Sequence, residues 1–409
     1  GYTWYKNSRL NRMSSWHNRA FSDIPSEIIF MQELKTGKTW SLGLNPMPDK
    51  NDYNVIYGFG YTKYIHESSN IYQELEVFVP REDSVKIGIL KLNNKSMERR
   101  KLRIVYYIKP VLGEDEIKSC GDVKVHFDIN ANIVEAQNLY ENEFKSIMYI
   151  SSSEKIKSYT GDKKFFLGEG GISNPDGLKK YNLNNDNGIG KNACIAMEIE
   201  VELESLSTKE IVLTFGAENN IVDLKNMAYK YGKLSNCKQE LENVKKYWKN
   251  ILEKMQVYTP IESLNIILNG WCLYQTISSR LIGRTGYYQS GGAFGFRDQL
   301  QDTLSLRYVE PEKMKNQILK HSRHQFFEGD VEHWWHDDTG RGIRTKFSDD
   351  LLWLPFMVEK YIETFDDKSI LDIETNYIKG KILQIGQDEK YDLYPESDQK
   401  ESIYLHCIR

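Results

Sequence analysis

Over roughly the first half of the chain, from residue 1 to about residue 217, apolar and polar positions alternate with a period of two. The clearest run is Met197–Glu204, where four apolar residues alternate with four glutamates. Successive side chains of a strand point to opposite faces, so this run predicts a half-buried strand with a fully acidic outer face. Turn-forming clusters such as Asn174-Pro175-Asp176-Gly177 separate many similar short runs. We therefore expect a large antiparallel β-super-sandwich over residues 1–220.

The period changes at about Val222. Apolar residues then recur at helical spacing between charged ones, which predicts an amphipathic linker helix within residues 221–258: Leu241, Val244, Trp248, Leu252 and Met255. Thr259-Pro260-Ile261-Glu262 has the pattern of a capping box with proline in the first turn, so a new helix should begin there. Its apolar positions cover most of the circumference and predict burial between other helices: Leu264, Ile267, Leu268, Trp271 and Tyr274.

Further helices are expected at about 296–308, 311–327 and 349–365, and a last one over Glu401–Arg409. Consecutive helices separated by polar and aromatic loops after a sandwich predict the start of an (α/α)6 barrel over residues 259–409. Gly1 is not an initiator methionine, and no helix stop signal follows the last segment. We expect a fragment of a longer protein whose barrel is incomplete here.

Size and composition narrow the class of protein. The 409 residues exceed the size at which one core stops growing, so at least two domains are expected. A net charge of −4 with interspersed signs argues against a nucleic-acid partner. The five scattered cysteines lack metal or disulfide spacing and indicate reduced thiols, and no apolar run reaches the length of a membrane span. A cytoplasmic location without membrane contact by this segment is therefore expected.

The stretch Thr285–Thr303 is the first candidate for chemistry. Its glycines permit a ligand to approach the backbone, and a helix is expected to begin at about Phe296. Within that helix Arg297 and Gln301 share one face, as do Asp298 and Asp302. A cation, an amide and two carboxylates at a glycine loop suit sugar hydroxyls and an anion, although an ion-paired helix start would show the same pattern.

The stretch His333–Asp350 is the second candidate. It carries two Trp, two Arg and four Asp, and four of the chain's eight His lie within His321–His336. Stable loops favour small and turn-forming residues, so a loop with these side chains is more typical of a functional site. Asp349 and Asp350 also fit a helix start, with Ser348 as N-cap, where carboxylates compensate the helix dipole.

These residues alone bring three kinds of chemistry into consideration: a metal site, a glycoside hydrolase, and a site with an anionic co-substrate. The spacing of His333 and His336 is conceivable for a metal, but HExxH is absent and two tryptophans would crowd the ligands, so no metal is expected. Carboxylate pairs among Asp298, Asp302 and Asp349 fit a glycoside hydrolase. The surplus of arginine around both stretches favours an anionic co-substrate instead, because arginine binds phosphate in a bidentate manner.

Tyr288–Asp302 and His333–Pro355 resemble the corresponding motifs of the inverting β-glycoside phosphorylases of glycoside hydrolase family 94. The likeness is strongest to the phosphorylase-like C-terminal domain of cyclic β-1,2-glucan synthases and to 1,2-β-oligoglucan phosphorylases. Tyr2–Arg9, Gly60–Thr62 and Thr160–Asp162 match that branch as well. The resemblance spans the whole chain.

The resemblance implies phosphorolysis of β-linked glucooligosaccharides, with inversion to α-glucose 1-phosphate, or control of glucan length within a synthase. Phosphate is then a co-substrate, and no other cofactor is expected. Substrate-binding residues would be Tyr288, Gln289, Arg297, Asp298, Gln301, Asp302, Trp334, Trp335, His336, Arg341, Arg344 and Asp349. Phosphate would be bound by Arg284, His333 and Arg344. The full-length protein is a candidate homodimer, and this segment a candidate cytosolic part of a membrane-bound synthase.

One departure from the family matters for activity. The family's general acid lies in a Trp-Asn-Asp segment, which would fall beyond Arg409 and does not occur in this chain. The resemblance therefore implies no catalytic acid among these residues, and the fragment alone should be inactive. A glycoside hydrolase and a non-catalytic carbohydrate-binding module remain the alternatives.

Overall fold

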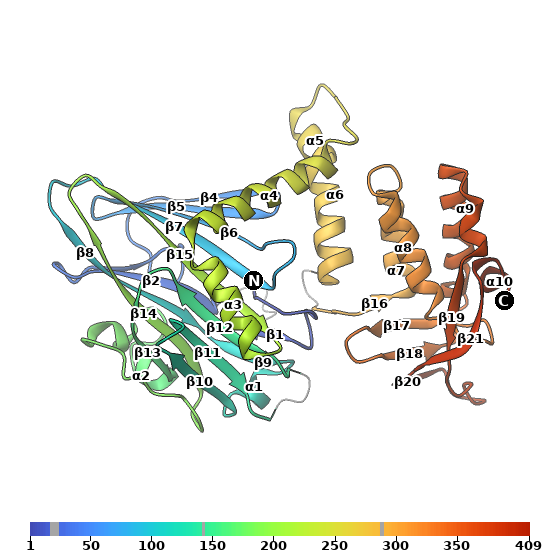
Figure 1. The fold of residues 1–409 in the computed structure, drawn as a ribbon, viewed down its shortest axis with the longest axis horizontal. Helices are drawn as coiled ribbons and strands as arrows, with labels where there is room; N and C mark the ends of the chain where they lie inside the picture. The colour runs from blue at the N-terminus through green and yellow to red at the C-terminus, as the bar shows by residue number, and fades with distance from the viewer. Residues whose placement is uncertain (17–23, 141–143, 287–289) are drawn as a thin grey trace. The chain divides into compact units, whose positions relative to one another are not determined.

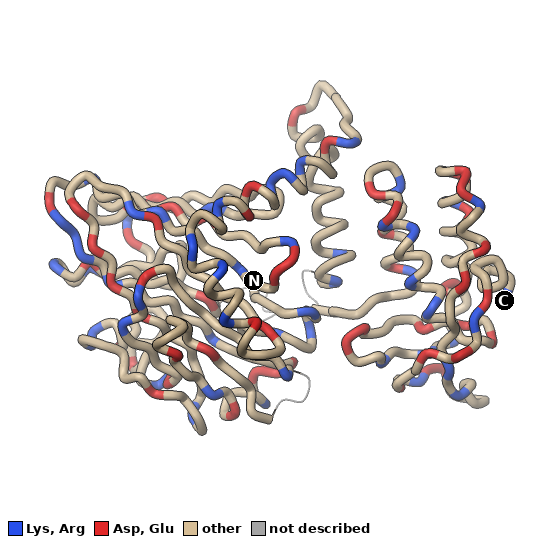
Figure 2. Tube along the Cα trace, in the orientation of Figure 1, with Lys and Arg blue, Asp and Glu red and all other residues tan. Residues whose placement is uncertain are grey.

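The computed structural model describes residues 1–16, 24–140, 144–286 and 290–409. It divides into two compact units, Gly1–Tyr247 and Trp248–Arg409, which we call the sandwich unit and the helical unit. Basic and acidic residues are interspersed along both units, as the composition indicates (Figure 2). No helix within the described ranges combines the length and apolar composition required to cross a lipid bilayer.

The sandwich unit contains two large antiparallel sheets, which confirms the predicted fold (Figure 1). The eight-stranded sheet has the order β10 (Val123–Asp128), β11 (Ile133–Asn138), β12 (Ile147–Ser152), β15 (Thr208–Glu218), β7 (Val85–Asn94), β6 (Ile71–Phe78), β5 (Tyr61–Ser68) and β4 (Tyr53–Gly58). The five-stranded sheet has the order β13 (Ile156–Asp162), β14 (Ala193–Leu203), β8 (Arg100–Ile108), β2 (Glu27–Glu33) and β3 (Thr39–Ser41). A separate pair joins β1 (Arg12–Ser14) to β9 (Pro110–Gly113).

Apolar and polar residues alternate along these strands, and the apolar sides of the two sheets form the core between them. On β7, Leu90 and Leu92 belong to the same buried cluster as Ile104 on β8 and Met197 on β14. Because side chains alternate across a strand, the intervening residues of each strand face away from that cluster. Short helices close the unit's loops: α1 (Glu116–Ser119), α2 (Lys163–Leu167) and the 3-10 turn η1 (Asp176–Lys179).

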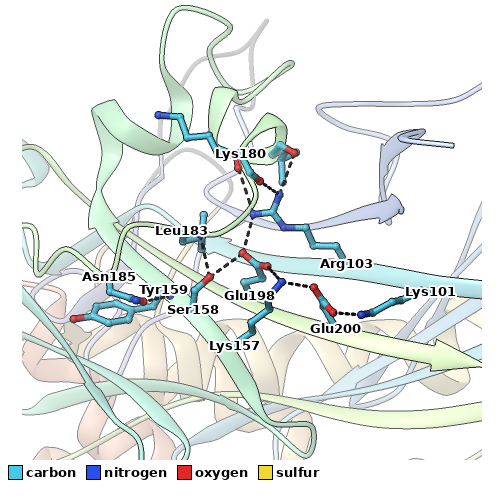
Figure 3. A network of polar contacts seen from close by, with 12 residues as sticks. Lys101, Arg103, Lys157, Ser158, Tyr159, Lys180, Leu183, Asn185, Glu198 and Glu200 are labelled. Atoms are coloured by element: carbon cyan, nitrogen blue, oxygen red, sulfur yellow. Dashed lines mark hydrogen bonds and ion pairs between the residues drawn. The ribbon is translucent and has the colours of Figure 1, made fainter. Parts of the chain in front are cut away.

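The acidic face predicted for Met197–Glu204 is partly covered. Glu198 is fully buried and accepts a hydrogen bond of 2.7 Å from Arg103, whose guanidinium also donates to the carbonyls of Leu178 and Lys180 (Figure 3). Ser158 donates to the same Glu198 oxygen at 2.8 Å. The outer face is acidic as predicted, but the segment that carries η1 covers it at Glu198, whereas Glu202 and Glu204 are exposed. A period of two cannot show which half of an outer face a distant segment covers.

Two helices follow the last strand of the sandwich. α3 (Ile221–Tyr231) begins at Asn220, whose side chain accepts hydrogen bonds from the backbone of Val222 and Asp223, and it packs on β15 and β12. α4 (Leu234–Leu252) buries Leu241, Val244, Trp248 and Leu252 at the predicted helical spacing. The helical character of this segment is therefore as predicted, and the division between the two units falls inside α4.

The helical unit begins with a continuous helical segment that includes two π-helical stretches: α5 (Glu262–Ile266), η2 (Ile267–Trp271), α6 (Cys272–Gln275) and η3 (Thr276–Gly283). Thr259 does not form the predicted capping box, because its hydroxyl accepts from the amide of Ile261 and contacts Asn265. Leu264, Ile267 and Leu268 are 37%, 48% and 44% exposed. Within the described residues this helix is thus not buried as its apolar pattern predicts.

The core of the helical unit lies among α7 (Phe296–Asp302), α8 (Pro311–Ser322) and α9 (Trp353–Phe365). The remaining elements are η4 (Thr303–Leu306), η5 (Asp350–Leu352), η6 (Lys368–Asp372), α10 (Ile403–Ile408), the pair β19 (Glu374–Ile378) and β21 (Glu396–Ser402), and a four-stranded sheet described below. The helices predicted at 296–308 and 349–365 are present as helical segments with 3-10 turns. The helix predicted at 311–327 ends at Ser322.

Candidate functional site

The two candidate stretches become neighbouring strands of one sheet. The order is β16 (Phe294–Gly295), β17 (Glu332–His336), β18 (Arg341–Thr345) and β20 (Glu389–Leu393). Phe294 pairs with Trp335, and Gly295 pairs with Trp334. The stretch predicted to be a loop is therefore largely a β-hairpin. Buried and accessible side chains do not alternate regularly along it, and the pairing of β17 with β18 shifts register between Glu332 and Trp334.

The helix α7 begins directly after β16 and presents its polar residues outward. Phe296, Gln299 and Leu300 are buried, whereas the candidate residues occupy the partly or fully exposed half of the helix: Arg297, Asp298, Gln301 and Asp302. The Gln299 side chain accepts a hydrogen bond from the Gly295 amide. An added Cβ at Gly295 would lie 2.4 Å from an Asp298 carboxylate oxygen, so a larger residue there would displace that side chain. The strand-to-helix turn thereby sets the direction of the polar face.

One guanidinium joins the two carboxylates of α7. Arg280, near the end of η3, donates to Asp302 at 2.9 Å and lies 3.7 Å from Asp298. The Asp302 side chain is 21% exposed. Burial raises the pKa of this carboxyl, although Arg280 opposes the rise. The sequence places these two arginine-carboxylate partners about twenty residues apart, and only the fold shows that they meet.

Two adjacent carboxylates connect α7 and β17 to the start of η5. Asp349 pairs with Arg297 at 2.8 Å, with side chains 51% and 45% exposed. Asp350 is buried and contacts Nδ1 of His333 at 2.6 Å. Burial raises the pKa of Asp350, although His333 opposes the rise. Asp349 stands at the N-cap position of η5 and Asp350 in its first turn, as the predicted helix start requires, but neither side chain forms a capping hydrogen bond and Ser348 is not the N-cap.

Arg284 precedes the glycine-rich stretch and binds backbone carbonyls on both sides of its own position in the chain. Its backbone has a left-handed φ of 49°, and its guanidinium donates to the carbonyls of Gly292 and Ile282 at 3.0 and 3.1 Å. The guanidinium also lies 4.2 Å from the centre of the Phe294 ring. Burial lowers the pKa of Arg284. Its predicted role in phosphate binding remains a prediction, and the candidates Tyr288 and Gln289 lie outside the described residues.

Three predicted ligand residues are buried in the helical unit. Trp335 is fully buried, with its ring stacked 3.7 Å from His324. Arg344 is 1% exposed and binds both Asp330 oxygens at 2.6 Å. His336 is 3% exposed. Trp335 belongs to the core of the helical unit and Arg344 is paired with Asp330, and the predicted roles of these three residues in ligand binding remain predictions.

The other hairpin candidates remain accessible. Trp334 is partly buried, with its ring 5.4 Å from that of Tyr391. Arg341 is exposed at the start of β18. His321, which lies in α8 and not in the hairpin, is fully buried and contacts the carbonyl oxygens of Gln317 and Gly295, at 2.9 and 3.2 Å. In the ranges that the structure covers, no three His, Cys, Asp or Glu are grouped as metal ligands.

A buried pair that the sequence analysis missed lies behind the hairpin. Glu332 is 1% exposed and lies 2.6 Å from Nδ1 of His324. Burial raises the pKa of Glu332 to about 9, and burial holds the pKa of His324 well below its usual range. At neutral pH the protonated carboxyl therefore donates to a neutral imidazole. An added Cβ at Gly342 would lie 2.0 Å from a Glu332 oxygen, so Gly342 provides the space for this acid.

Two family models cover nearly the whole chain. The supersandwich domain of glycosyl hydrolase 94 matches residues 1–234, and the catalytic domain of the glycosyl hydrolase 94 superfamily matches residues 247–409.

Two curated proteins and one solved structure that are similar to this chain are longer than it. The chain is 29% identical over its whole length to the cyclic β-(1,2)-glucan synthase NdvB of Rhizobium meliloti (strain 1021), of which it spans 14%. It is 23% identical to an N,N'-diacetylchitobiose phosphorylase of Vibrio furnissii, over 93% of this chain and 52% of that protein. A solved bacterial glucoamylase complexed with acarbose shares the fold at a TM-score of 0.56 and 9% identity, over 88% of this chain and 52% of that one.

Proposed function

Since the chain belongs to the glycosyl hydrolase 94 family, we propose that it forms the sandwich and the first part of the catalytic region of a β-glucan phosphorylase. The family membership confirms the resemblance found in the motifs. The chain spans about half or less of the curated relatives that it matches. The proposed activity is therefore that of the whole protein to which these residues belong.

The observation that supports this proposal is the charged cluster on the exposed half of α7. Arg297 with Asp349, and Arg280 with Asp302, form two partly exposed ion pairs beside one another. Partly exposed pairs contribute little to stability, so their hydrogen-bonding capacity is available to a ligand. In our proposal Arg297 and Asp302 bind the hydroxyls of the transferred glucosyl unit, while Asp349 and Arg280 hold these two side chains in position.

The proposed reaction requires one carboxylic acid and one anion. An oxygen of phosphate attacks the anomeric carbon, the glycosidic C–O bond breaks, and a carboxylic acid donates its proton to the departing oxygen. The products are α-glucose 1-phosphate and a shortened glucan. Phosphate is already anionic, so no second carboxylate is needed to activate a nucleophile, in contrast to hydrolysis. We propose His333 and Arg284 at the phosphate side, and the proton donor beyond Arg409.

The proposed linkage is β-1,2. Its support is the 29% identity to a protein named as a cyclic β-(1,2)-glucan synthase, over the whole of this chain. A phosphorylase region within such a synthase would shorten glucans when phosphate is abundant and extend them when glucose 1-phosphate accumulates. Chain-length control and stand-alone phosphorolysis thus share one chemistry, and the same assay measures both directions.

The test uses the full-length protein with β-1,2-linked glucooligosaccharides. We expect α-glucose 1-phosphate to appear only when phosphate is present, and Asp302→Asn and Arg297→Ala to lower kcat/KM by about 100-fold, as expected when a hydrogen bond to a charged group is lost. Glu396→Gln, on the exposed end of β21, is the control and should leave kcat/KM unchanged. Reducing sugar released equally without phosphate would refute phosphorolysis and favour a hydrolase.

A further inference from the structure

The sandwich unit contains a cavity, partly open to solvent, that the family match does not explain. It has a volume of about 490 Å³ and lies between the two sheets, with walls that include Ile29 from β2, Val77 from β6, Tyr106 from β8 and Leu213 from β15. Pockets for small ligands have volumes of this order and combine apolar walls with a few polar groups. This cavity has both features.

A charged pair lies on core-facing positions beside it. Lys86 shares its side of β7 with the core residues Leu90 and Leu92, and Glu27 shares its side of β2 with Met31. Lys86 and Glu27 form an ion pair across the two sheets, with side chains 22% and 17% exposed. Apolar residues of similar size would usually serve stability equally well at such positions.

The charges of Lys86 and Glu27 are compensated by each other and by neighbouring hydroxyls. Thr3 and Ser14 donate to one Glu27 oxygen at 2.5 and 2.6 Å, Lys86 binds the other oxygen, and Lys86 also donates to Thr3 at 2.6 Å. Burial favours the protonated carboxyl, but Lys86 and these hydroxyls outweigh it, so the pKa of Glu27 is lowered. A carboxylate and an ammonium that satisfy one another offer no net charge to a metal ion or to phosphate.

The unsatisfied groups of the cavity are hydroxyls. Tyr64 and Tyr106 both line it, and within the described residues no hydrogen bond involves either phenol. Tyr106 is 7% exposed, and burial together with the charge of Glu27 raises its pKa. Thr62 and Asn45 also line the cavity and add a hydroxyl and an amide. Among the described residues, the Ser26 hydroxyl also lines the cavity and is buried without a hydrogen-bond partner, whereas the two phenol oxygens are accessible to solvent. These groups favour a ligand that supplies donors and acceptors.

We propose that this cavity binds one or two glucosyl units of a neutral β-glucan, at a site in the sandwich unit that is separate from the residues of the helical unit. A pyranose ring has an apolar C–H face for the aliphatic and tyrosine walls and hydroxyls for the free phenols. The choice of glucan as ligand rests on the proposed function, whereas the preference for a neutral, hydroxyl-rich ligand rests on the cavity itself. Such a site would hold a long glucan on the protein between reaction cycles.

Binding is measured by calorimetry with β-1,2-linked glucooligosaccharides of two to four units, on this chain and on the full-length protein. Both carry Asp302→Asn, which weakens the site proposed on α7. Tyr64→Phe and Tyr106→Phe should each raise Kd about five-fold, the effect of one neutral hydrogen bond. Thr62→Trp should fill the cavity and abolish binding. Tyr57→Phe is the matched control, because Tyr57 lies on the same sheet, is 68% exposed and does not line the cavity.

The two proposals fail separately. Unchanged Kd in both phenylalanine variants and in Thr62→Trp would overturn the cavity site, whatever the outcome of the phosphorolysis assay. Binding by this chain that is lost in the full-length protein would also overturn it, because preceding residues would then fill the cavity. Conversely, cavity binding without phosphate-dependent release of glucose 1-phosphate would uphold this site and refute the proposed function. Circular dichroism of each variant establishes that it is folded.

Discussion

Replacing Glu332 by Gln should stabilise the helical unit at neutral pH. Glu332 is 1% exposed beside the neutral imidazole of His324, and burial raises its pKa to about 9. Gln has the same shape, and its amide can donate to Nδ1 of His324 as the protonated carboxyl does. The substitution therefore keeps the contact and removes only the proton that the carboxyl must retain to stay buried.

The size of the effect follows from the two pKa values of this group. The unfolded chain releases the proton near the ordinary value of 4.5, whereas the folded chain holds it to about pH 9. Between these values the folded state binds more protons, so stability is complete below pH 4.5 and falls as the pH rises towards 9. Each pH unit costs ~1.4 kcal/mol, so the loss at pH 7 is roughly 3 kcal/mol. Glu332→Gln has no titrating carboxyl at this position, so the variant does not lose this stability as the pH rises.

Urea unfolding at pH 5, 7 and 8.5 measures the difference, and hydrogen exchange of peptides from β17 and β18 assigns it to the hairpin. The advantage of the variant should be small at pH 5, roughly 3 kcal/mol at pH 7 and larger at pH 8.5. Glu396→Gln makes the same chemical change at an exposed position of the same unit and serves as control. Parallel pH dependence in the wild-type protein and Glu332→Gln would refute the protonated buried acid.

Three other substitutions test the remaining structural conclusions. Arg103→Met should cost about 3 kcal/mol in urea unfolding because it leaves buried Glu198 with only Ser158 and the more distant Lys157 as partners, and adding Glu198→Met should restore most of that loss; strictly additive losses would contradict a coupled pair. Asp350→Asn should change the tautomer of His333 without unfolding the helical unit, and nitrogen NMR of the imidazole ring detects this change. An unchanged ring spectrum would show that Asp350 does not orient the His333 ring. Trp335→Ala should cost about 3–5 kcal/mol of stability, whereas a ligand-facing tryptophan would affect glucan binding and leave the unfolding midpoint unchanged.

Local patterns were sufficient for the fold class. The period of two through Met197–Glu204 and the helical spacing of Leu241 to Leu252 both reflect side-chain directions that the backbone sets within a few residues. The two dense motifs were specific enough to identify the family, which the family models confirm. The predicted bounds differed from the structure where a turn replaced the end of a helix, as after Ser322, and where strands replaced a predicted loop, as in the hairpin from Glu332.

In the candidate site, the spacing of residues along the helix was predictable from the sequence, but their ion-pair partners were not. Arg297, Asp298, Gln301 and Asp302 lie on the accessible half of one helix, because their spacing alone determines that arrangement. Their partners could not be read from the chain. Arg280 reaches Asp302 from an earlier helix, and Asp349 reaches Arg297 from a segment beyond the hairpin.

The amino-acid sequence by itself determined the β-sandwich, the change to helices and the family, since each depends on short-range periodicity or on contiguous motifs. Tertiary structure alone decided which charged residues are accessible. It buried Trp335 and Arg344, revealed Glu332 as a neutral acid, and placed Lys86 and Glu27 beside a cavity between the sheets. The physical reason is that burial and ion pairing depend on segments far apart in sequence, and these effects determine the charge and accessibility of each side chain.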